Sequence, residues 1–404
     1  MSGNGVSLSA VRFLRPGHKV VPAPKPVNGG CRRTVRRGRS SGSGPVSSRA
    51  MTVLFLDAAV PADRERWLAA WRAWPDREVA AHPTYVELFT APGQRAIAAV
   101  LDGSDSDGGV LYPFVLRPLA AEVWADDGDD RWDSITPYGY GGPWAWGTGR
   151  ERSEEFWDAW DAWATGEGRV VSAFIRLALF PEQLLATIRG EVLDRMPNVA
   201  RSLDLDDDTL WYDYAHKVRK NVKRARKHEL HVEVDTTGER MDEFLAIYER
   251  TMERRGAADG FYFPRAFFQT IVADLPGNFA FFHVLDGERM VSTELVLVSE
   301  DTLYSFLGGT EQDAFPMRPN DLLKHEVIRW GRDHGRKWFV LGGGYGGADG
   351  IFKYKLAFAP KGEVTFRIGQ RIIDPAACDA LMARRREQDP TWEPATDYFP
   401  PYRA

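Results

Sequence analysis

The chain has 404 residues, a formal net charge of -5, 27% charged residues and 44% hydrophobic residues. These values are typical of a globular protein, and they exclude a collagen, a wholly disordered chain and a small disulfide scaffold. The length predicts two domains. Two cysteines are too few for a structural zinc site, and they favour a reducing compartment such as the cytoplasm. No run of 18 apolar residues occurs, so the sequence predicts no transmembrane helix.

The net charge is distributed unevenly along the chain. Residues 1–50 hold ten of the 52 Lys and Arg and none of the 57 Asp and Glu, so this tail carries +10 and the rest carries -15. The tail is rich in Gly, Ser, Pro and Arg and has no hydrophobic periodicity, which predicts a disordered basic tail. A nucleic-acid-binding arm is one interpretation of the tail. We favour the other, a segment outside the fold.

From residue 51 the pattern alternates between strands and amphipathic helices. In the first half, strands are predicted at 53–56, 95–101, 109–117 and 170–179. Helices are predicted at 61–74, 154–164 and 181–188. Tryptophans line the apolar face of the first two helices, so we expect these rings to pack in the core.

The second half repeats this order. Helices are predicted at 211–228, 241–254, 263–275 and 321–334. Strands are predicted at 232–234, 279–285, 290–299, 302–308 and 337–341. The repetition predicts an α+β fold of two related lobes, 51–200 and 201–375, followed by a C-terminal extension, 376–404.

Four segments carry a recognisable pattern. Residues 217–233 combine a basic helix with a short strand, and 318–335 contain a Pro-x-x-Leu-Leu helix that ends in glycine. Residues 341–361 combine a glycine-rich stretch with an aromatic-Lys-x-x-Phe signature, and 137–143 form a Gly-Pro loop. In this order and spacing, the segments resemble the GNAT superfamily and, within it, the two-lobed FemABX-like proteins. The likeness is strongest over residues 210–362.

The resemblance implies two tandem GNAT-like lobes, each a mixed, largely antiparallel sheet flanked by helices, with a cleft between them. The better-known members transfer an aminoacyl group from aminoacyl-tRNA to an amine of a cell-wall precursor or a natural product. The resemblance therefore implies an amide-forming acyltransferase with an acyl donor as co-substrate and no other cofactor. The family's tRNA-binding coiled-coil insertion has no counterpart, because only a short basic helix is present.

Aminolysis of an activated ester requires a positioned amine, loss of its proton and a partner for the oxyanion. Lys355 lies in an aromatic stretch where the resemblance places the family's functional lysine, so it is the predicted partner of the oxyanion or of a donor phosphate. Lys353 would share its face if the segment were a strand. Glu294, in an apolar strand, could accept a proton with a raised pKa or could face solvent. Asp349 could pair with either lysine.

The predicted basic helix is the main candidate for binding the donor. Nine lysines follow residue 50, and four of them lie in this helix. A local excess of positive charge in an acidic protein would attract a phosphate-bearing partner such as tRNA, whereas a solvated helix face is the alternative interpretation. The residues assigned to donor or tRNA binding in this helix are Lys217, Arg219, Lys220, Lys223, Arg224 and Lys227.

The glycines at 342–347 match neither a Walker loop nor a dinucleotide fingerprint. Gly343 and Gly344 could let the backbone pass close to a bound donor, together with Lys353, or could belong to a flexible loop. The histidines show no metal-binding spacing, and no metal site is predicted.

The Gly-Pro loop is the predicted acceptor side. Cell-wall members carry a carboxylate shortly after this Gly-Pro and lysines in the first lobe, whereas here a Trp-Ala-Trp sequence follows and residues 51–216 contain no lysine. These departures favour the amine of a specialised metabolite or a peptide. The predicted acceptor-binding residues are Tyr138, Tyr140, Trp144, Trp146 and Arg176.

Two other hypotheses stay open. An acyl-CoA-dependent N-acyltransferase of the same fold would need a pyrophosphate loop of the type Arg/Gln-x-x-Gly-x-Gly/Ala before a helix, but residues 315–319 read Phe-Pro-Met-Arg-Pro. A non-catalytic binding protein that kept the fold is the third hypothesis.

Overall fold

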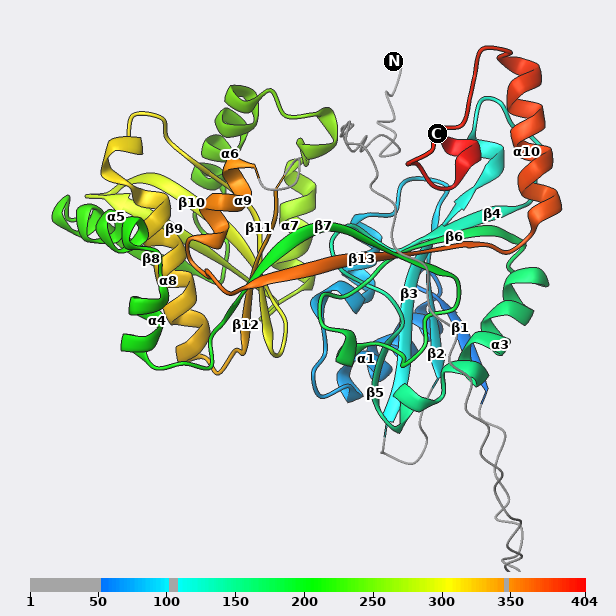
Figure 1. Ribbon diagram of the computed structural model, residues 1–404, viewed down its shortest axis with the longest axis horizontal. Coiled ribbons are helices and arrows are strands. Elements are labelled where there is room, and N and C mark those ends of the chain that lie inside the picture. The colour runs from blue at the N-terminus through cyan, green and yellow to red at the C-terminus, as the bar shows by residue number, and fades with distance from the viewer. Residues whose placement is uncertain (1–51, 102–107, 345–348) are drawn as a thin grey trace, which may run out of the picture.

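The computed structural model describes residues 52–101, 108–344 and 349–404. The predicted disordered tail lies outside these residues. In these described ranges, thirteen strands join into one sheet that runs through two lobes lying side by side (Figure 1). Within the described residues, no helix combines the length and the apolar character needed to cross a bilayer.

The first lobe is built on strands in the order β1-β2-β3-β4-β6, with β5 paired to β3. These strands are β1 (Val53–Asp57), β2 (Arg95–Leu101), β3 (Gly108–Pro118), β4 (Trp132–Ile135), β5 (Trp144–Gly147) and β6 (Val170–Arg176). Its helices are α1 (Pro61–Ala73), α2 (Pro83–Leu88) and α3 (Ser153–Thr165). Neighbouring strands are antiparallel except β4 and β6, which are parallel.

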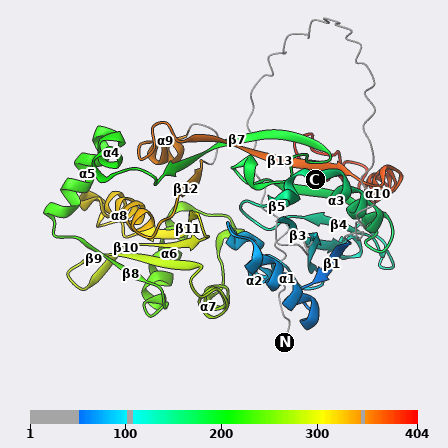
Figure 2. The same ribbon diagram turned by 90° about the horizontal axis from the view of Figure 1, so that it is seen from below.

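The second lobe repeats this arrangement in the order β8-β9-β10-β11-β12. These strands are β8 (His231–Asp235), β9 (Phe279–Asp286), β10 (Arg289–Val298), β11 (Thr302–Thr310) and β12 (Trp338–Gly343). Here β11 and β12 are the parallel pair. One face of the sheet is covered by α6 (Met241–Arg255) and α7 (Arg265–Asp274). The other face carries α4 (Asp207–Asp213), α5 (His216–Lys227), α8 (Pro319–Asp333) and α9 (Gly350–Leu356) (Figure 2).

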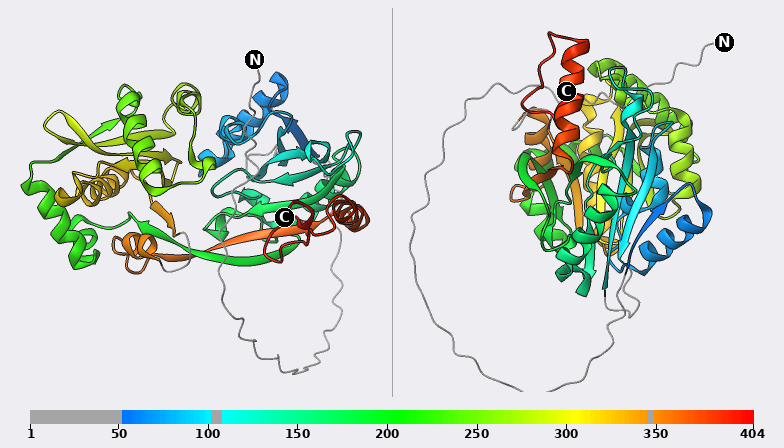
Figure 3. Two further views of the ribbon diagram at one scale, coloured as in Figure 1. Left: turned by 90° about the horizontal axis from the view of Figure 1, so that it is seen from above. Right: turned by 90° about the vertical axis from the view of Figure 1, so that its right-hand side faces the viewer.

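Two long strands are exchanged between the halves of the chain. β7 (Glu191–Ser202) pairs with the second-lobe strand β12, whereas β13 (Glu363–Ile372) pairs with the first-lobe strand β6. β7 and β13 also pair with each other, and together they bridge the two lobes along one side of the molecule (Figures 1 and 3). The lobes therefore do not separate at a single point of the sequence.

Aromatic side chains fill the core of the first lobe, as the helix pattern predicts. Trp67 and Trp71 of α1, and Phe156, Trp157 and Trp160 of α3, are all buried. Removing rings of this size from water stabilises the fold by roughly 1.5–3 kcal/mol each. The predictions for helices 61–74 and 154–164 are confirmed.

The C-terminal residues belong to the packing of the first lobe. Helix α10 (Pro375–Gln388) buries Cys378 and Leu381 against this lobe. Tyr402 is fully buried, and its hydroxyl lies 2.6 Å from Ser172 Oγ. Arg403 forms ion pairs with carboxylates of the first lobe. The segment that the sequence suggests as an extension is thus an integral part of the lobe.

Two predicted helices are wrong. In place of a helix over 181–188 there is one 3-10 turn, Pro181–Gln183, because Leu184 forms a β-bridge with Trp144 and Leu185 N donates to Pro143 O. The single helix predicted at 211–228 is divided into α4 and α5. The break occurs because Ala215 N donates to Ala357 O (2.9 Å) instead of continuing the helical hydrogen bonds.

Candidate functional site

The parallel strands β11 and β12 diverge near the middle of the second lobe. They pair only where Thr302–Tyr304 meet Trp338–Val340. Beyond this point β11 pairs with β10 alone, and the end of β12 pairs with β7. The divergence exposes the ends of two strands to side chains from both lobes, and these side chains form the candidate site.

Lys355 reaches this divergence from α9. The helix begins after Asp349, whose Oδ1 accepts a hydrogen bond from Phe352 N (2.8 Å), so Asp349 acts as an N-cap. Lys355 Nζ donates to Gly343 O (2.7 Å). The segment is thus a helix and not a strand. On a helix, residues two apart do not share a face, and Lys353 is exposed while Lys355 is partly buried.

Gly342 allows groups from both lobes to converge. Its φ of +84° favours glycine, and a β-carbon there would lie 3.2 Å from Lys355 Nζ and 3.8 Å from Tyr140 Oη. Tyr140 belongs to the Gly-Pro loop of the first lobe, and its hydroxyl donates to Asn198 Oδ1 (2.6 Å) on β7. The structure therefore brings the predicted lysine and a predicted acceptor-side tyrosine together.

The environment of Lys355 weakens its hold on a proton. Burial lowers the pKa of Lys355 to about 8, and the nearby Lys324 ammonium acts in the same direction, while the carboxylates of Glu294 and Asp349 oppose the shift. An ammonium with this pKa is charged at neutral pH and sits in a poorly hydrated place. Both properties suit a group that stabilises a developing oxyanion.

Glu294 is buried on β10 with 5% of its surface exposed, so the solvent-facing alternative is wrong. Its Oε1 accepts hydrogen bonds from Lys324 Nζ and Ser305 Oγ, and Lys324 Nζ also lies 2.7 Å from Ser305 Oγ. Its other oxygen, Oε2, has no hydrogen-bond partner among the described residues. Lys324 was not among the residues selected from the sequence. Its position amid the apolar residues of the α8 helix is the signal that could have identified it.

A buried carboxyl group from the first lobe joins this region. Glu78 accepts hydrogen bonds from Tyr304 Oη (2.9 Å) on β11 and from Gln183 Nε2 (2.9 Å). Burial raises the pKa of Glu78 to about 7, against the opposing effect of its hydrogen bonds. The Tyr304 ring stacks on Tyr140, with centroids 5.5 Å apart. Sequence patterns gave no sign of Glu78, because its partners are distant in the chain.

The other predicted acceptor residues are divided between the surface and the core. Tyr138 is 37% exposed beside Phe89 and Phe306, so it remains available to a ligand. Trp144 is fully buried, and Trp146 stacks on Trp74 within the first lobe. The expectation that Trp144 lines an open pocket is therefore wrong, because its ring completes the core.

Arg176 is engaged by its own lobe. Its Nη1 donates to Thr136 O (2.7 Å), and burial lowers the pKa of its guanidinium to about 10. Its hydrogen-bonding capacity is directed at the backbone between β4 and β6. This arrangement does not support the predicted role in acceptor binding.

Helix α5 presents a row of cations to solvent. It buries Val218, Val222 and Ala225 against the second lobe. At 3.6 residues per turn, five of its basic residues fall within an arc of about 120° on the opposite side. These five residues are exposed and form no ion pair with any described residue: Lys217, Lys220, Lys223, Arg224 and Lys227. Arg219 differs, because its Nη1 donates to the carbonyls of Tyr212 (2.8 Å) and Tyr214.

The glycine-rich segment is described only at its ends. The carbonyl of Gly343 holds Lys355, and a β-carbon at Gly344 would lie 2.5 Å from the Asp349 carboxylate. Glycine is therefore required for close approach at Gly344. Residues 345–348 lie outside the described residues.

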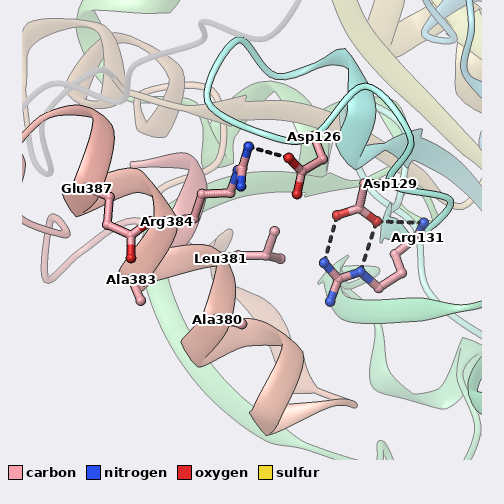
Figure 4. A pocket seen from close by; sticks show the side chains of 8 residues that line it. All are labelled: Asp126, Asp129, Arg131, Ala380, Leu381, Ala383, Arg384 and Glu387. Atoms are coloured by element: carbon pink, nitrogen blue, oxygen red, sulfur yellow. Dashed lines mark hydrogen bonds and ion pairs between the residues drawn. The ribbon is translucent and has the colours of Figure 1, made fainter.

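A hollow of about 330 Å³ lies elsewhere, between α10 and the loop before β4 (Figure 4). Its arginines are neutralised by its aspartates, since Arg384 pairs with Asp126 and Arg131 pairs with Asp129. It is far along the sheet from the convergence of Lys355 and Tyr140, and it is no candidate for the chemistry.

Comparison with known proteins shows which class of protein has this fold. Residues 213–356, which include Lys355, match the family model described as an acetyltransferase (GNAT) domain. The structure of FemX aligns with a TM-score of 0.58 at 12% identity, covering 78% of this chain and 98% of FemX. No curated protein matches the chain in sequence. Residues 213–356 therefore form a GNAT-type acyltransferase domain, and the chain as a whole has a FemABX-like GNAT fold.

Two further structures share the fold. The C-terminal domain of a putative lysylphosphatidylglycerol synthetase from Agrobacterium fabrum aligns with a TM-score of 0.50 at 15% identity, covering 79% of this chain and 96% of that one. A conserved protein of unknown function from Bacteroides thetaiotaomicron aligns with a TM-score of 0.52 at 11% identity, covering 79% and 99%. The two-lobed arrangement therefore recurs at very low sequence identity.

Proposed function

We propose that the protein forms an amide bond by moving an aminoacyl group from aminoacyl-tRNA to an amine. The observation that carries this proposal is the contact between the start of α5, the helix that carries the cations, and the residues that follow Lys355. The residue before α5, Ala215, donates its N–H to Ala357 O, two residues beyond Lys355. A polyanionic donor bound along α5 would therefore lie next to the buried lysine.

In the proposed reaction, the acceptor nitrogen attacks the ester carbonyl of the donor and forms the C–N bond. The C–O bond to the tRNA ribose then breaks, and the proton lost by the amine reaches the released hydroxyl. Lys355 would stabilise the carbonyl oxygen as it gains negative charge. Glu294 Oε2 is the proposed first acceptor of the proton, because it has no hydrogen-bond partner among the described residues.

The relatives and the first lobe support the choice of substrates. The names FemX and lysylphosphatidylglycerol synthetase favour an aminoacyl group over an acetyl group. Residues 51–216 contain no lysine, and Arg176 is engaged by backbone carbonyls. This supports the amine of a small metabolite or a peptide over a cell-wall precursor that carries a nucleotide pyrophosphate.

The second candidate is transfer from an acyl-CoA, which the match to an acetyltransferase domain favours. A pyrophosphate would gain from the amide groups at the start of α8. However, the buried Asp321 carboxylate already occupies this turn, accepting a hydrogen bond from Asn221 Nδ2 (3.1 Å). We expect its negative charge to oppose a second anion, and we therefore place this donor second.

The test uses the full chain with a panel of amines and two donors. Aminoacylated tRNA carrying labelled amino acids should give labelled amide product, and RNase treatment of the donor should abolish it. Acetyl-CoA without RNA serves as the competing donor. Transfer that survives RNase and requires the thioester would overturn the proposal. Binding of both substrates without turnover would indicate a non-catalytic protein.

A further inference from the structure

We infer that the corner between α4 and α5 is a stacking platform for an unpaired base of the donor RNA, with Tyr212 as the stacking residue. The inference rests on the proposed function, because it takes the RNA to be the donor. It adds a site of a different kind, which recognises the face of a base instead of a phosphate.

Tyr212 is unusually exposed for an aromatic residue. It is 70% exposed, more than any other described aromatic side chain. It lies near the end of α4, where Leu210 and Tyr214 on either side are buried and anchor the segment. The buried residues on either side hold the exposed ring in one place, where a flat partner can cover it.

Arg219 holds this corner in place. Its Nη1 donates to Tyr212 O (2.8 Å) and to Tyr214 O, so a guanidinium on α5 fixes the end of α4 and the residue that follows it. The same guanidinium lies 6.0 Å from the centre of the Tyr212 ring. This cation–aromatic pair offers a base a π-surface beside a positive charge, which is a common way to bind single-stranded nucleic acid.

The platform lies at the head of the α5 cation row. The exposed, unpaired lysines of α5 begin at Lys217, five residues after Tyr212, and end at Lys227. Lys223 lies 5.8 Å from the ring centre of Trp211, which forms a second cation–aromatic pair at the same corner. Phosphates tracking along α5 would therefore bring an adjoining base to Tyr212.

The platform is also joined to the candidate site. Ala215 N donates to Ala357 O, and the Tyr214 ring packs 5.8 Å from Phe358, three residues beyond Lys355. The single-stranded 3′ end of a tRNA carries the aminoacyl ester. A base of this end held on Tyr212 would place the ester on the side of the lobe where Lys355 lies.

Binding to uncharged tRNA tests the inference, with Tyr212→Ala, Tyr212→Phe and the matched control Tyr262→Ala, whose ring is 42% exposed elsewhere in the second lobe. Stacking predicts that Tyr212→Ala weakens binding by roughly 5- to 150-fold, with an unchanged slope of log K against log salt. Tyr212→Phe and Tyr262→Ala should remain within about twofold of wild type. Lys220→Gln should instead lower the salt slope by about one.

Shortening the tRNA provides a second measurement. Removal of the last three nucleotides of the tRNA should weaken binding to the wild type and leave it insensitive to Tyr212→Ala. Wild-type affinity in Tyr212→Ala, or a salt slope that falls as it does in Lys220→Gln, would overturn the inference and leave the proposed function standing. If the wild type shows no salt-dependent binding to tRNA, the proposed function fails as well.

Discussion

The two lobes repeat one strand order, but they differ at the ends of their parallel strands. In the first lobe, Arg176 N donates to Thr136 Oγ1 (2.8 Å) and Arg176 Nη1 donates to Thr136 O, so the ends of β4 and β6 are joined. In the second lobe, the corresponding strands β11 and β12 diverge, and Lys355 and Tyr140 meet there. In one lobe the ends of the parallel strands are thus joined, and in the other they are open at the candidate site.

The lobes also differ in how they neutralise cations. Buried Arg117 and Arg403 of the first lobe both form ion pairs with Asp133. In the second lobe, the five α5 cations are unpaired among the described residues, and Lys355 is held by a backbone carbonyl. A repeated fold therefore does not imply a repeated function, because function follows the charges left without a partner.

The largest effect is expected when the buried pair of the second lobe is broken. Lys324→Met would leave Glu294 buried without its counter-ion, and the free energy of unfolding should fall by about 3–5 kcal/mol. Lys337→Met removes a surface pair with Asp301 and should cost less than about 1 kcal/mol. Urea unfolding of both variants measures the difference. Equal, small losses would show that Lys324 is not a buried counter-ion.

The second largest effect is expected on catalysis, at the candidate site where β11 and β12 diverge. Lys355→Met should lower kcat by about 10²–10³-fold, or about 2.7–4 kcal/mol, because the oxyanion loses its cation. Lys353→Met, on the exposed face of the same helix, is the control and should change kcat less than about twofold. Because the pKa of Lys355 is lowered to about 8 by burial, the ammonium and the wild-type rate should decline as pH rises through that value. Similar rates for the two variants would rule out the assigned role.

The third prediction concerns Glu78, a buried first-lobe carboxyl group that accepts a hydrogen bond from Tyr304 of the second lobe. Because burial raises its pKa from 4.5 to about 7, the folded state binds the proton more tightly, and this stabilisation is present below pH 4.5 and lost as pH rises through 7. Glu78→Gln removes the titration. The stability of the variant relative to wild type should therefore rise by about 3 kcal/mol between pH 4.5 and 8. Glu300→Gln, which removes a carboxylate from an exposed pair with Arg77, is the control.

The smallest effect is expected at the contact between the lobes. Tyr140→Phe keeps the ring stacked on Tyr304 but removes the hydrogen bond to Asn198, at a cost of about 1 kcal/mol. We expect kcat/KM for the acceptor to fall about fivefold, with the donor KM unchanged. A change confined to the donor KM would place Tyr140 on the donor side instead.

Much of the second lobe could be predicted because its signals are local. Helix α6 shows clear apolar periodicity, β9 and β10 are largely apolar runs, and the cation row on α5 can be counted directly. The missed elements are those whose partners are distant. β7 contains Pro197 and several charged residues, and it is a strand because β12 and β13 supply its hydrogen bonds. Polar strands of this kind carry no pattern of their own.

The sequence by itself determined the fold class, the lysine of the candidate site and the uneven distribution of positive charge. Composition and periodicity report on neighbours within a few turns of chain, and these features are local. Only the tertiary structure decided that β7 and β13 are exchanged, that Lys355 lies on a helix, that Tyr140 of the other lobe comes close to it, and that Glu78 reaches Tyr304. These contacts join residues that are far apart in the chain, and the burial that they cause shifts the pKa values of Lys355 and Glu78.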